Sequence, residues 1–325
     1  MNYYISDTHF GHVNVINFSN RPFASVEEMD EAMINNWNRK VRKNDTVYII
    51  GDLIYKSSKS PEWYLDQLNG KKVLIIGNHD NSWLQSVEPS AYFEEVTQYK
   101  EVRLDNHPLT FCHYPMLEWQ NSRKVGSRKL GYMVHGHIHN SDMKMYRPLF
   151  EIGNALNAGV DINGFEPVTF EELERNNERF KLSVLSDPVS KAFFLCRKYH
   201  MLQCDKSGKS YAEHPIYVAS HFDDNICKIV ALLHDTLEDT SLSPDIIKAE
   251  FSVEILESVL AMTRREGEEY LDYVKRLSLD PIAKAVKIED LKHNMDLSRL
   301  PIVTDADLER VEKYRKALDV LTYGE

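Results

Sequence analysis

The sequence predicts an α/β first half followed by an all-α second half. Short apolar runs that end in Gly, Asp, Asn or His recur through the first 180 residues, which is typical of buried strands that deliver polar side chains at their carboxyl ends. Strand patterns then fade, and Asp-Pro and Ser-Pro pairs mark helix starts. The chain has 325 residues, which is long enough for two domains. We expect them at residues 1–180 and 183–325.

The acidic net charge limits which classes of partner the protein can bind. The formal net charge is −11. Long nucleic acid and anionic membrane surfaces require clustered Lys and Arg, so we expect neither as a partner. A small phosphorylated substrate remains compatible with this charge, because bound metal ions supply positive charge locally. The sequence predicts no particular protein partner.

Cysteine usage and the hydropathy pattern predict a cytoplasmic protein. The four cysteines form no Cys-x-x-Cys pair and lie at apolar positions, which favours buried free thiols over disulfides. No apolar run approaches the ~18 residues of a membrane span. No basic and then apolar leader precedes the first strand pattern. We therefore expect neither secretion nor a membrane span.

The first apolar run is followed by two side chains with the spacing of metal ligands. Residues 3–6 read as a strand, and Asp7 and His9 project toward one side just past its end. A capping box at residues 25–28 then opens a helix through Val41. Met and Trp residues share one face of that helix, which indicates core rather than a cofactor site.

Four more apolar runs end in the same way. The second and third strands, at residues 46–50 and 71–76, each lead through a glycine into polar side chains that crowd one small volume. Residues 109–112 and 132–134 lead into imidazoles. The side chains at these four strand ends are Asp52; Asn78, His79 and Asp80; His113; and His135, His137 and His139. Carboxylate and amide oxygens combined with imidazoles suit Mn²⁺, Fe²⁺, Co²⁺ or Zn²⁺, in numbers sufficient for two ions.

Some basic residues near these blocks have two interpretations. A basic loop at residues 121–129, which includes Arg128, lies between two of the histidine blocks and could grip a phosphate group. The alternative is a solvated surface loop. Arg21 and His12 have the same two interpretations.

The five blocks together resemble the calcineurin-like metallophosphoesterases. The signature of that family is Asp-x-His, Gly-Asp, Gly-Asn-His-Asp/Glu, a lone His and then Gly-His-x-His, and all five parts occur here in order within residues 1–175. The resemblance implies a metallophosphoesterase α/β sandwich with two divalent ions. One ion would be held by Asp7, His9 and His139 and the other by Asn78, His113 and His137, with Asp52 bridging. His79 would be the general acid, oriented by Asp80, and His135 lies outside the motif.

The second half contains its own candidate metal site. His234 and Asp235 follow the apolar run at residues 229–233, and Glu238 and Asp239 come one helical turn later. A buried His-Asp pair beside two further acids is costly unless a cation compensates, so the pattern favours a metal. A buried ion-paired network is the alternative.

The sequence around these residues resembles that of HD-domain phosphohydrolases of the RelA/SpoT type. The matching segments are residues 203–211, 213–215, 232–240 and 286–294, within a region of about residues 188–322. The resemblance implies an α-helical HD domain with one divalent ion, commonly Mn²⁺. Its ligands would be His214, His234, Asp235 and Asp290, Glu238 and Asp239 would activate water, and Asn294 would help to position it.

One departure from the alarmone hydrolases concerns the substrate. Where those enzymes often carry Arg-Lys-Asp after the glutamine, this chain has Cys204, Asp205 and Lys206 in a shorter loop. No synthetase or regulatory domain is recognisable. We predict that Lys206 and Tyr211 contact the substrate.

These patterns predict a metal-dependent bifunctional phosphohydrolase acting on phosphorylated nucleotides or related small phosphoesters. An alternative is a phosphodiesterase for cyclic or short oligonucleotides in which the HD domain acts as a nucleotide sensor. Intact ligand sets in both halves favour two enzymatic sites over sensing.

Overall fold

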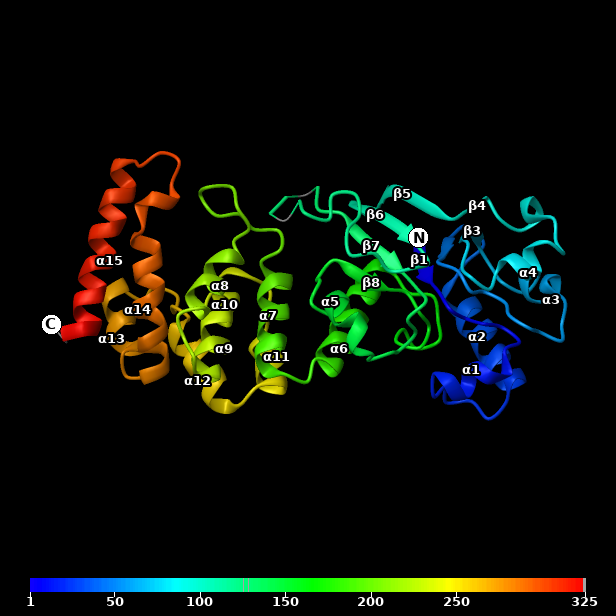
Figure 1. The fold of residues 1–325 in the computed structure, drawn as a ribbon, viewed down its shortest axis with the longest axis horizontal. Helices are drawn as coiled ribbons and strands as arrows, with labels where there is room; N and C mark the ends of the chain where they lie inside the picture. The colour runs from blue at the N-terminus through cyan, green and yellow to red at the C-terminus, as the bar shows by residue number, and fades with distance from the viewer. Residues whose placement is uncertain (125, 128, 324–325) are drawn as a thin grey trace. The chain divides into compact units, whose positions relative to one another are not determined.

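The computed structural model describes residues 1–124, 126–127 and 129–323, and these divide into two compact units (Figure 1). Unit 1 contains Met1–Lys124, Lys129–Phe150 and Asn154–Val184, and unit 2 contains the chain from Leu185 onward with Glu151–Gly153. Unit 1 is α/β and unit 2 is helical, so the predicted fold class is confirmed. No helix in the described ranges is long and apolar enough to cross a membrane.

A parallel sheet positions the first polar side chains of unit 1. Within the described residues it has four strands in the order β1 to β4, namely β1 (Asn2–Ile5), β2 (Thr46–Ile49), β3 (Lys71–Ile75) and β4 (Glu95–Thr97). Parallel strands end at the same edge of a sheet, so the residues after β1, β2 and β3 converge there. Helix α2 (Val26–Lys40), capped by Ser25, packs Met29 and Trp37 into the core beneath this sheet.

A second sheet brings the histidine blocks to the same place. Its four described strands are β5 (Tyr99–Leu104), β6 (His107–Cys112), β7 (Tyr132–His135) and β8 (Ala155–Asn157). Strands β6, β7 and β8 are parallel, and β5 pairs with β6 as a hairpin. The hairpin turns at Asp105 and Asn106, both with positive φ, as tight hairpin turns require.

The two sheets meet through β1. Ser6 N donates to Ala158 O at 2.9 Å, and Tyr4 exchanges backbone hydrogen bonds with Val168. These bonds place the carboxyl end of β1 beside that of β8. The ligand-bearing loops of both sheets therefore surround Asp7.

Helix α6 (Phe170–Val184) is the last element of unit 1. The capping box at its start is present, because Thr169 N donates to the Glu172 carboxylate and Glu172 N donates to Thr169 Oγ1. The helix runs to Val184 and buries Leu173 and Lys181. The Lys181 ammonium donates to Ala155 O at 2.6 Å. A domain cut near Lys181 would therefore fall inside this helix.

Short helices complete unit 1 at its periphery. They are α1 (Val13–Phe18), α3 (Pro61–Leu65), α4 (Asn81–Leu84) and α5 (Arg147–Phe150), with 3₁₀ turns η1 (Pro89–Ala91) and η2 (Lys144–Tyr146). Helix α1 begins directly after the Asp7 to His9 loop, so it lies close to the converging strand ends.

Unit 2 is built around helix α9 (Asn225–Leu233), which is buried on most sides. The other described helices are α7 (Pro188–Tyr199), α8 (Glu213–Ala219), α10 (Thr236–Asp239), α11 (Pro244–Glu250), α12 (Val253–Met262), α13 (Tyr270–Leu277), α14 (Pro281–Met295) and α15 (Asp305–Tyr323), with the 3₁₀ turn η3 (Leu297–Arg299). Helix α9 contacts α7, α8, α12 and α14. Asp187 and Asp280, from the Asp-Pro pairs that predicted helix starts, accept backbone hydrogen bonds at the starts of α7 and α14.

Candidate metal centres

The loops that carry the candidate ligands of unit 1 are held in an unusual backbone conformation. A positive φ is uncommon for residues other than glycine, and such residues cluster at functional sites. Several candidate ligands adopt it, with φ values of 57°, 50°, 55°, 73° and 50° for Asp7, His9, Asp52, His137 and His139. The fold therefore holds these side chains in positions that the local backbone alone would not favour.

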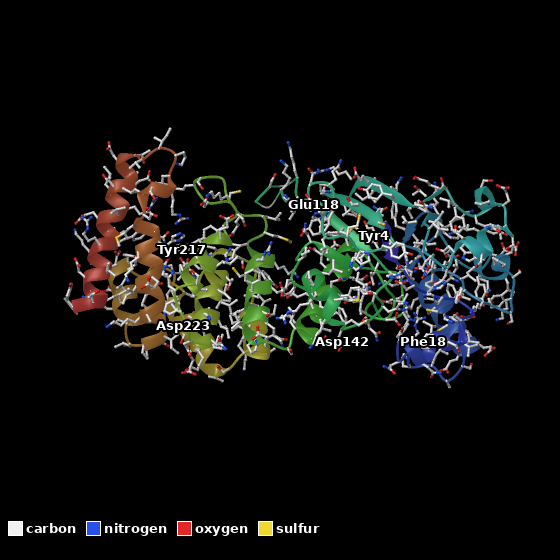
Figure 2. The ribbon with its side chains drawn as sticks, in the orientation of Figure 1. Tyr4, Phe18, Glu118, Asp142, Tyr217 and Asp223 are labelled. Carbon is white, nitrogen blue, oxygen red and sulfur yellow. The ribbon has the colours of Figure 1, made fainter. Side chains whose placement is uncertain are left out.

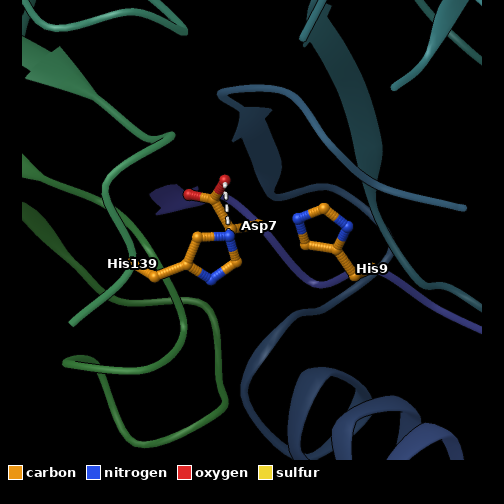
Figure 3. Close-up of side chains that lie close together, drawn as sticks. All are labelled: Asp7, His9 and His139. Carbon is orange, nitrogen blue, oxygen red and sulfur yellow. Dashed lines mark ion pairs between the residues drawn. The ribbon is translucent and has the colours of Figure 1, made fainter. Parts of the chain in front are cut away.

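Asp7, His9 and His139 form one group of candidate ligands (Figure 3). One ligand atom from each lies within 4.8 Å of the others. Nε2 of His139 is 3.9 Å from Asp7 Oδ1, the ion pair dashed in Figure 3, and the rings of His9 and His139 stack at 5.0 Å. The backbone N–H of His137 donates to both oxygens of Asp7, which fixes that carboxylate.

Asn78, His113 and His137 form a second group beside the first. Asn78 Oδ1 is 3.0 Å from His113 Nε2 and 3.1 Å from His137 Nδ1. Asp52 lies between the groups, since its Oδ2 is 3.5 Å from His9 Nε2 and 3.4 Å from His113 Nε2. A single carboxylate oxygen is thus within reach of both groups.

His79 and Asp80 differ in what they contact. Nε2 of His79 is 3.9 Å from Asp52 Oδ2, and its ring lies against Tyr55 with centroids 3.9 Å apart. We predicted that Asp80 orients the His79 imidazole, and the structure corrects this. The Asp80 carboxylate is fully buried and accepts hydrogen bonds from the backbone N–H groups of residues 52, 53 and 77 and from the Trp83 indole. It therefore braces the loops after β2 and β3.

The electrostatics of this cluster fit a bound cation. Both ring nitrogens of His9 are buried and have no hydrogen-bond partner among the described residues. Burial opposes ionisation of Asp52, yet the neighbouring His113 lowers the pKa of that carboxyl to about 2. Burial likewise opposes protonation of His113, while Asp52 raises its pKa to about 9. A positive charge at this position is therefore stabilised. Burial lowers the pKa of His9, which favours a neutral ring with one lone pair that can bind a metal ion.

Asp161 was not predicted from the sequence, and Arg21 has neither of the two roles considered for it. The Arg21 guanidinium is buried, pairs with Asp161 at 2.8 Å and donates to the carbonyl oxygens of Asp7 and Thr8. Asp161 Oδ2 is also 2.8 Å from His139 Nδ1. Arg21 therefore braces the ligand loop instead of gripping a phosphate group. The strand before Asp161 is too short to stand out in the sequence.

A pocket of about 880 Å³ opens onto this cluster and is lined by His9, His79, His137 and His139. His12 also lines this pocket. Burial lowers the pKa of His12, and nearby positive charges add to this effect. A lowered pKa disfavours the charged ring that would attract a phosphate group. The lining includes no described residue of the basic loop at 121–129. Arg128, predicted to bind substrate, lies outside the described residues.

A second candidate centre lies inside unit 2. His214 comes from α8, His234 and Asp235 from the break between α9 and α10, and Asp290 from α14. His214 Nε2 is 3.0 Å from Asp290 Oδ1, and His234 Nε2 is 3.1 Å from Asp235 Oδ2. The longer cross pairs, His214 with Asp235 and His234 with Asp290, are 3.8 and 3.7 Å. The four predicted ligands are thus gathered at one point.

This centre also fits a cation. Nε2 of His214 and Nε2 of His234 are buried and make no hydrogen bond within the described part of the chain, although carboxylate oxygens are near. Burial alone would lower the pKa of His234, but the Asp235 carboxylate raises it to about 10. These imidazole nitrogens lie near carboxylate oxygens but do not form hydrogen bonds with them. A divalent ion between the two kinds of group would bind both.

Two residues that contact these ligands were not predicted from the sequence. Nδ1 of His293 is 2.6 Å from Nδ1 of His214, and the Lys287 ammonium is 2.8 Å from Asp290 Oδ2. Both lie three residues from Asp290 on helix α14, so helical spacing was the signal that could have found them.

The other predicted residues of this half lie around the centre. Asn294 Nδ2 donates to Asp290 Oδ1 at 2.6 Å, and the Tyr211 hydroxyl donates to Asp235 Oδ2 at 2.6 Å. Glu238 and Asp239 are exposed, and Glu238 accepts a hydrogen bond from Arg264 N. A pocket of about 310 Å³ is lined by Lys206, Tyr211, His214 and Asn294, where Lys206 pairs with Asp307 at 2.8 Å.

Comparison with known proteins assigns each half a set of relatives. The profile of the calcineurin-like phosphoesterase family matches residues 3–200. An uncharacterized protein of Methanocaldococcus jannaschii is 32% identical over 182 residues, covering 55% of this chain and 93% of that protein. These similarities confirm the predicted resemblance of the first half.

The relatives of the second half belong to larger or distant proteins. A probable GTP pyrophosphokinase of Mycobacterium leprae is 31% identical over 147 residues, which is 41% of this chain and 18% of that protein. The structure of a metazoan ortholog of SpoT that hydrolyzes ppGpp covers 42% of this chain and 87% of that chain, with 22% identity and a TM-score of 0.36. The sequence similarity to the pyrophosphokinase agrees with the predicted RelA/SpoT-type resemblance and spans 18% of that protein.

Proposed function

Because the chain belongs to the calcineurin-like phosphoesterase family and is a metal-dependent phosphoester hydrolase, we propose that it carries two hydrolytic centres, one in each unit. The observation that carries this proposal is shared by both candidate centres. In each, buried imidazole nitrogens without hydrogen-bond partners among the described residues face buried carboxylates. Such a donor set is complete only with a cation.

In unit 1, the two ligand groups would hold two divalent ions, with Asp52 between them. The ions, when bound, supply Lewis acidity at the phosphoryl group. Protein residues then provide orientation and proton transfer. His79 is only partly buried, at the pocket wall, so its protonated ring can donate a proton to the leaving alkoxide, a role worth typically 10²–10⁴-fold. Tyr55 packs against that ring and limits its motion.

In unit 2, His214, His234, Asp235 and Asp290 would hold one divalent ion, for which Mn²⁺ is our expectation. That ion supplies Lewis acidity at the phosphate group. Glu238 and Asp239, one turn beyond the ligand pair, are the candidates to accept a proton from the attacking water. Asn294 holds Asp290 through its amide, which supports a positioning role.

A small phosphorylated nucleotide is the substrate class that we propose. The metazoan relative hydrolyzes ppGpp, and Lys206 and Tyr211 line the pocket of unit 2 together with His214, which supports this proposal. The similarity to the pyrophosphokinase covers 18% of that protein, so its activity is not carried over. A cytoplasmic location and domains at residues 1–180 and 183–325 stay predictions.

Substitution of one carboxylate in each centre tests the proposal. With Mn²⁺ supplied, Asp52→Asn is expected to lower hydrolysis of bis(4-nitrophenyl) phosphate by more than about 100-fold, since even outer partners of metal ligands are worth 10–100-fold. Glu238→Ala is expected to stop phosphate or pyrophosphate release from the nucleotides that unit 2 hydrolyses. Asp66→Asn, on the surface of unit 1, is the control. Full activity of Asp52→Asn would reject the dinuclear centre.

The competing proposal is that unit 2 senses a nucleotide and controls a phosphodiesterase in unit 1. Retained binding with lost turnover in Glu238→Ala supports catalysis. Unchanged turnover in that variant supports sensing.

A further inference from the structure

Aromatic rings line the pocket of unit 1 from the candidate proton donor to the surface. Tyr55 lies against His79, and His12 meets Tyr55 edge to face with centroids 4.8 Å apart. Phe18 in turn meets His12 at 6.3 Å. We call Tyr55, His12 and Phe18 the aromatic wall. All three line the pocket of about 880 Å³, so the wall connects the reacting end of the pocket with its rim.

The outer part of the pocket carries two exposed apolar side chains among polar ones. Phe18, at the end of helix α1, is 77% exposed, and Met143, which also lines the pocket, is 54% exposed. Figure 2 labels Phe18 and also Asp142, the neighbour of Met143 in the sequence. Asn140 Nδ2 donates to Ser19 O at 2.9 Å and so ties together the two segments that carry these side chains. Large apolar side chains at the rim of a polar pocket are typical of a binding surface.

We propose that the first centre acts on phosphoesters that carry a nucleobase, and that the base stacks on Phe18 and contacts Met143. This inference rests on the proposed phosphoesterase function of that centre. The pocket volume lies within the range of about 300–1,000 Å³ for small-molecule sites, which leaves room for a base and sugar beyond the phosphate. A base has a planar face that stacks on an aromatic ring, a contact worth on the order of tenfold in affinity.

The polarity of the wall agrees with this assignment. Phe18 offers a ring face, and Asn20 and Asn140 line the same pocket with amide groups that can pair with sugar hydroxyls. An aliphatic phosphoester would gain only apolar contact area with Phe18, which a leucine can also provide. A nucleobase stacks on an aromatic ring, which a leucine lacks. The two substrate classes therefore respond differently to replacement of Phe18 by leucine.

The test compares a nucleotide with the sugar phosphate that carries a hydroxyl group in place of the base. In the full chain carrying Asp290→Ala to silence unit 2, adenosine 5′-monophosphate and ribose 5-phosphate are measured as inhibitors of bis(4-nitrophenyl) phosphate hydrolysis with Mn²⁺. We expect the nucleotide to bind on the order of tenfold more tightly. Phe18→Ala and Phe18→Leu should remove this difference and leave the ribose 5-phosphate constant unchanged, and Phe18→Trp should keep it. Val13→Ala is the control, because Val13 is 59% exposed on the same helix but does not line the pocket.

The outcomes separate this inference from the proposed function. Equal binding of the two ligands, or equal weakening of both by Phe18→Ala, overturns the base site. A difference that survives in Phe18→Leu also overturns stacking and favours an aliphatic contact. Calorimetric titration of both ligands into the Mn²⁺-loaded chain measures the preference even if bis(4-nitrophenyl) phosphate is not hydrolysed. A lack of hydrolysis would count against the phosphoesterase proposal and not against the base site.

Discussion

Arg21 and Asp161 set the orientation of His139. An arginine side chain is always charged, and a buried one requires a partner, which Asp161 provides. Asp161 also accepts a hydrogen bond from His139 Nδ1, which places the ring proton on Nδ1. Nε2 of His139, which faces Asp7, is then left with its lone pair for a metal.

Replacement of Asp161 by asparagine should therefore weaken metal binding in unit 1. The amide leaves the Arg21 charge uncompensated and no longer fixes the His139 tautomer, so we expect a loss of about 10–100-fold in affinity for one of two ions. Titration of the apo chain with Mn²⁺, read by equilibrium dialysis, measures it. Asp142→Asn makes the same chemical change in an exposed residue of the pocket and should have no effect. Unchanged affinity in a folded Asp161→Asn variant would contradict the positioning role.

His293 has the corresponding role in unit 2. Arg299 donates to His293 Nδ1 at 3.1 Å, so that nitrogen is an acceptor, and His214 must donate its own Nδ1 proton to it. Nε2 of His214 therefore carries a lone pair toward Asp290. The ring of His293 also stacks on Tyr217 at 3.9 Å.

Replacement of His293 by phenylalanine keeps this stacking and removes the acceptor. We expect the affinity of unit 2 for Mn²⁺ to fall about 10–100-fold while the fold is kept. His221→Phe is a matched control, since His221 also contacts the Tyr217 ring but lies away from the candidate ligands. Equal metal affinities of the two variants would show that His293 serves packing only.

At the level of elements, the sequence predicted those strands that are apolar and buried on both faces. Strands β1, β2, β3, β6 and β7 fall in that class. Strands β4 and β8 have three residues each, and β5 alternates exposed and partly buried positions without a buried apolar run, so all three lacked the signal. The candidate ligands were predictable because they follow the recognisable strands, whereas Asp161 follows β8 and was missed.

The end of helix α6 yields a prediction about fragment stability. A fragment of residues 1–180 loses the buried Leu182 side chain and the hydrogen bond from Lys181 to Ala155 O, which a fragment of residues 1–184 retains. Burial of a leucine contributes about 1.5–3 kcal/mol, and a buried hydrogen bond contributes about 1 kcal/mol. The midpoint of thermal unfolding should be lower by roughly 2–4 °C for each kcal/mol lost. A fragment of residues 1–187 should match 1–184, and equal midpoints for all three would place the end of unit 1 before Lys181.

At the scale of the whole molecule, each candidate centre draws its ligands from one unit. The residues from Asp7 to His139 that form the first centre belong to unit 1, and those from His214 to Asp290 belong to unit 2. Neither ligand set borrows a side chain from the other unit. The chemistry of each centre should therefore survive loss of the other, unless the units are coupled through a bound nucleotide.

Reciprocal single-site variants of the full chain measure that coupling. Asp52→Asn should abolish hydrolysis at the first centre and leave the nucleotide hydrolysis of unit 2 within about twofold, because sites that share no partners behave additively. Asp290→Ala should do the reverse, since it removes a carboxylate on which both His214 and His234 converge. Both activities are measured on each variant with and without added nucleotide. Asp290→Ala could instead change the rate of the first centre only when nucleotide is present. Unit 2 would then be a sensor that controls unit 1, because coupling between two sites appears as a ligand-dependent change at the other site.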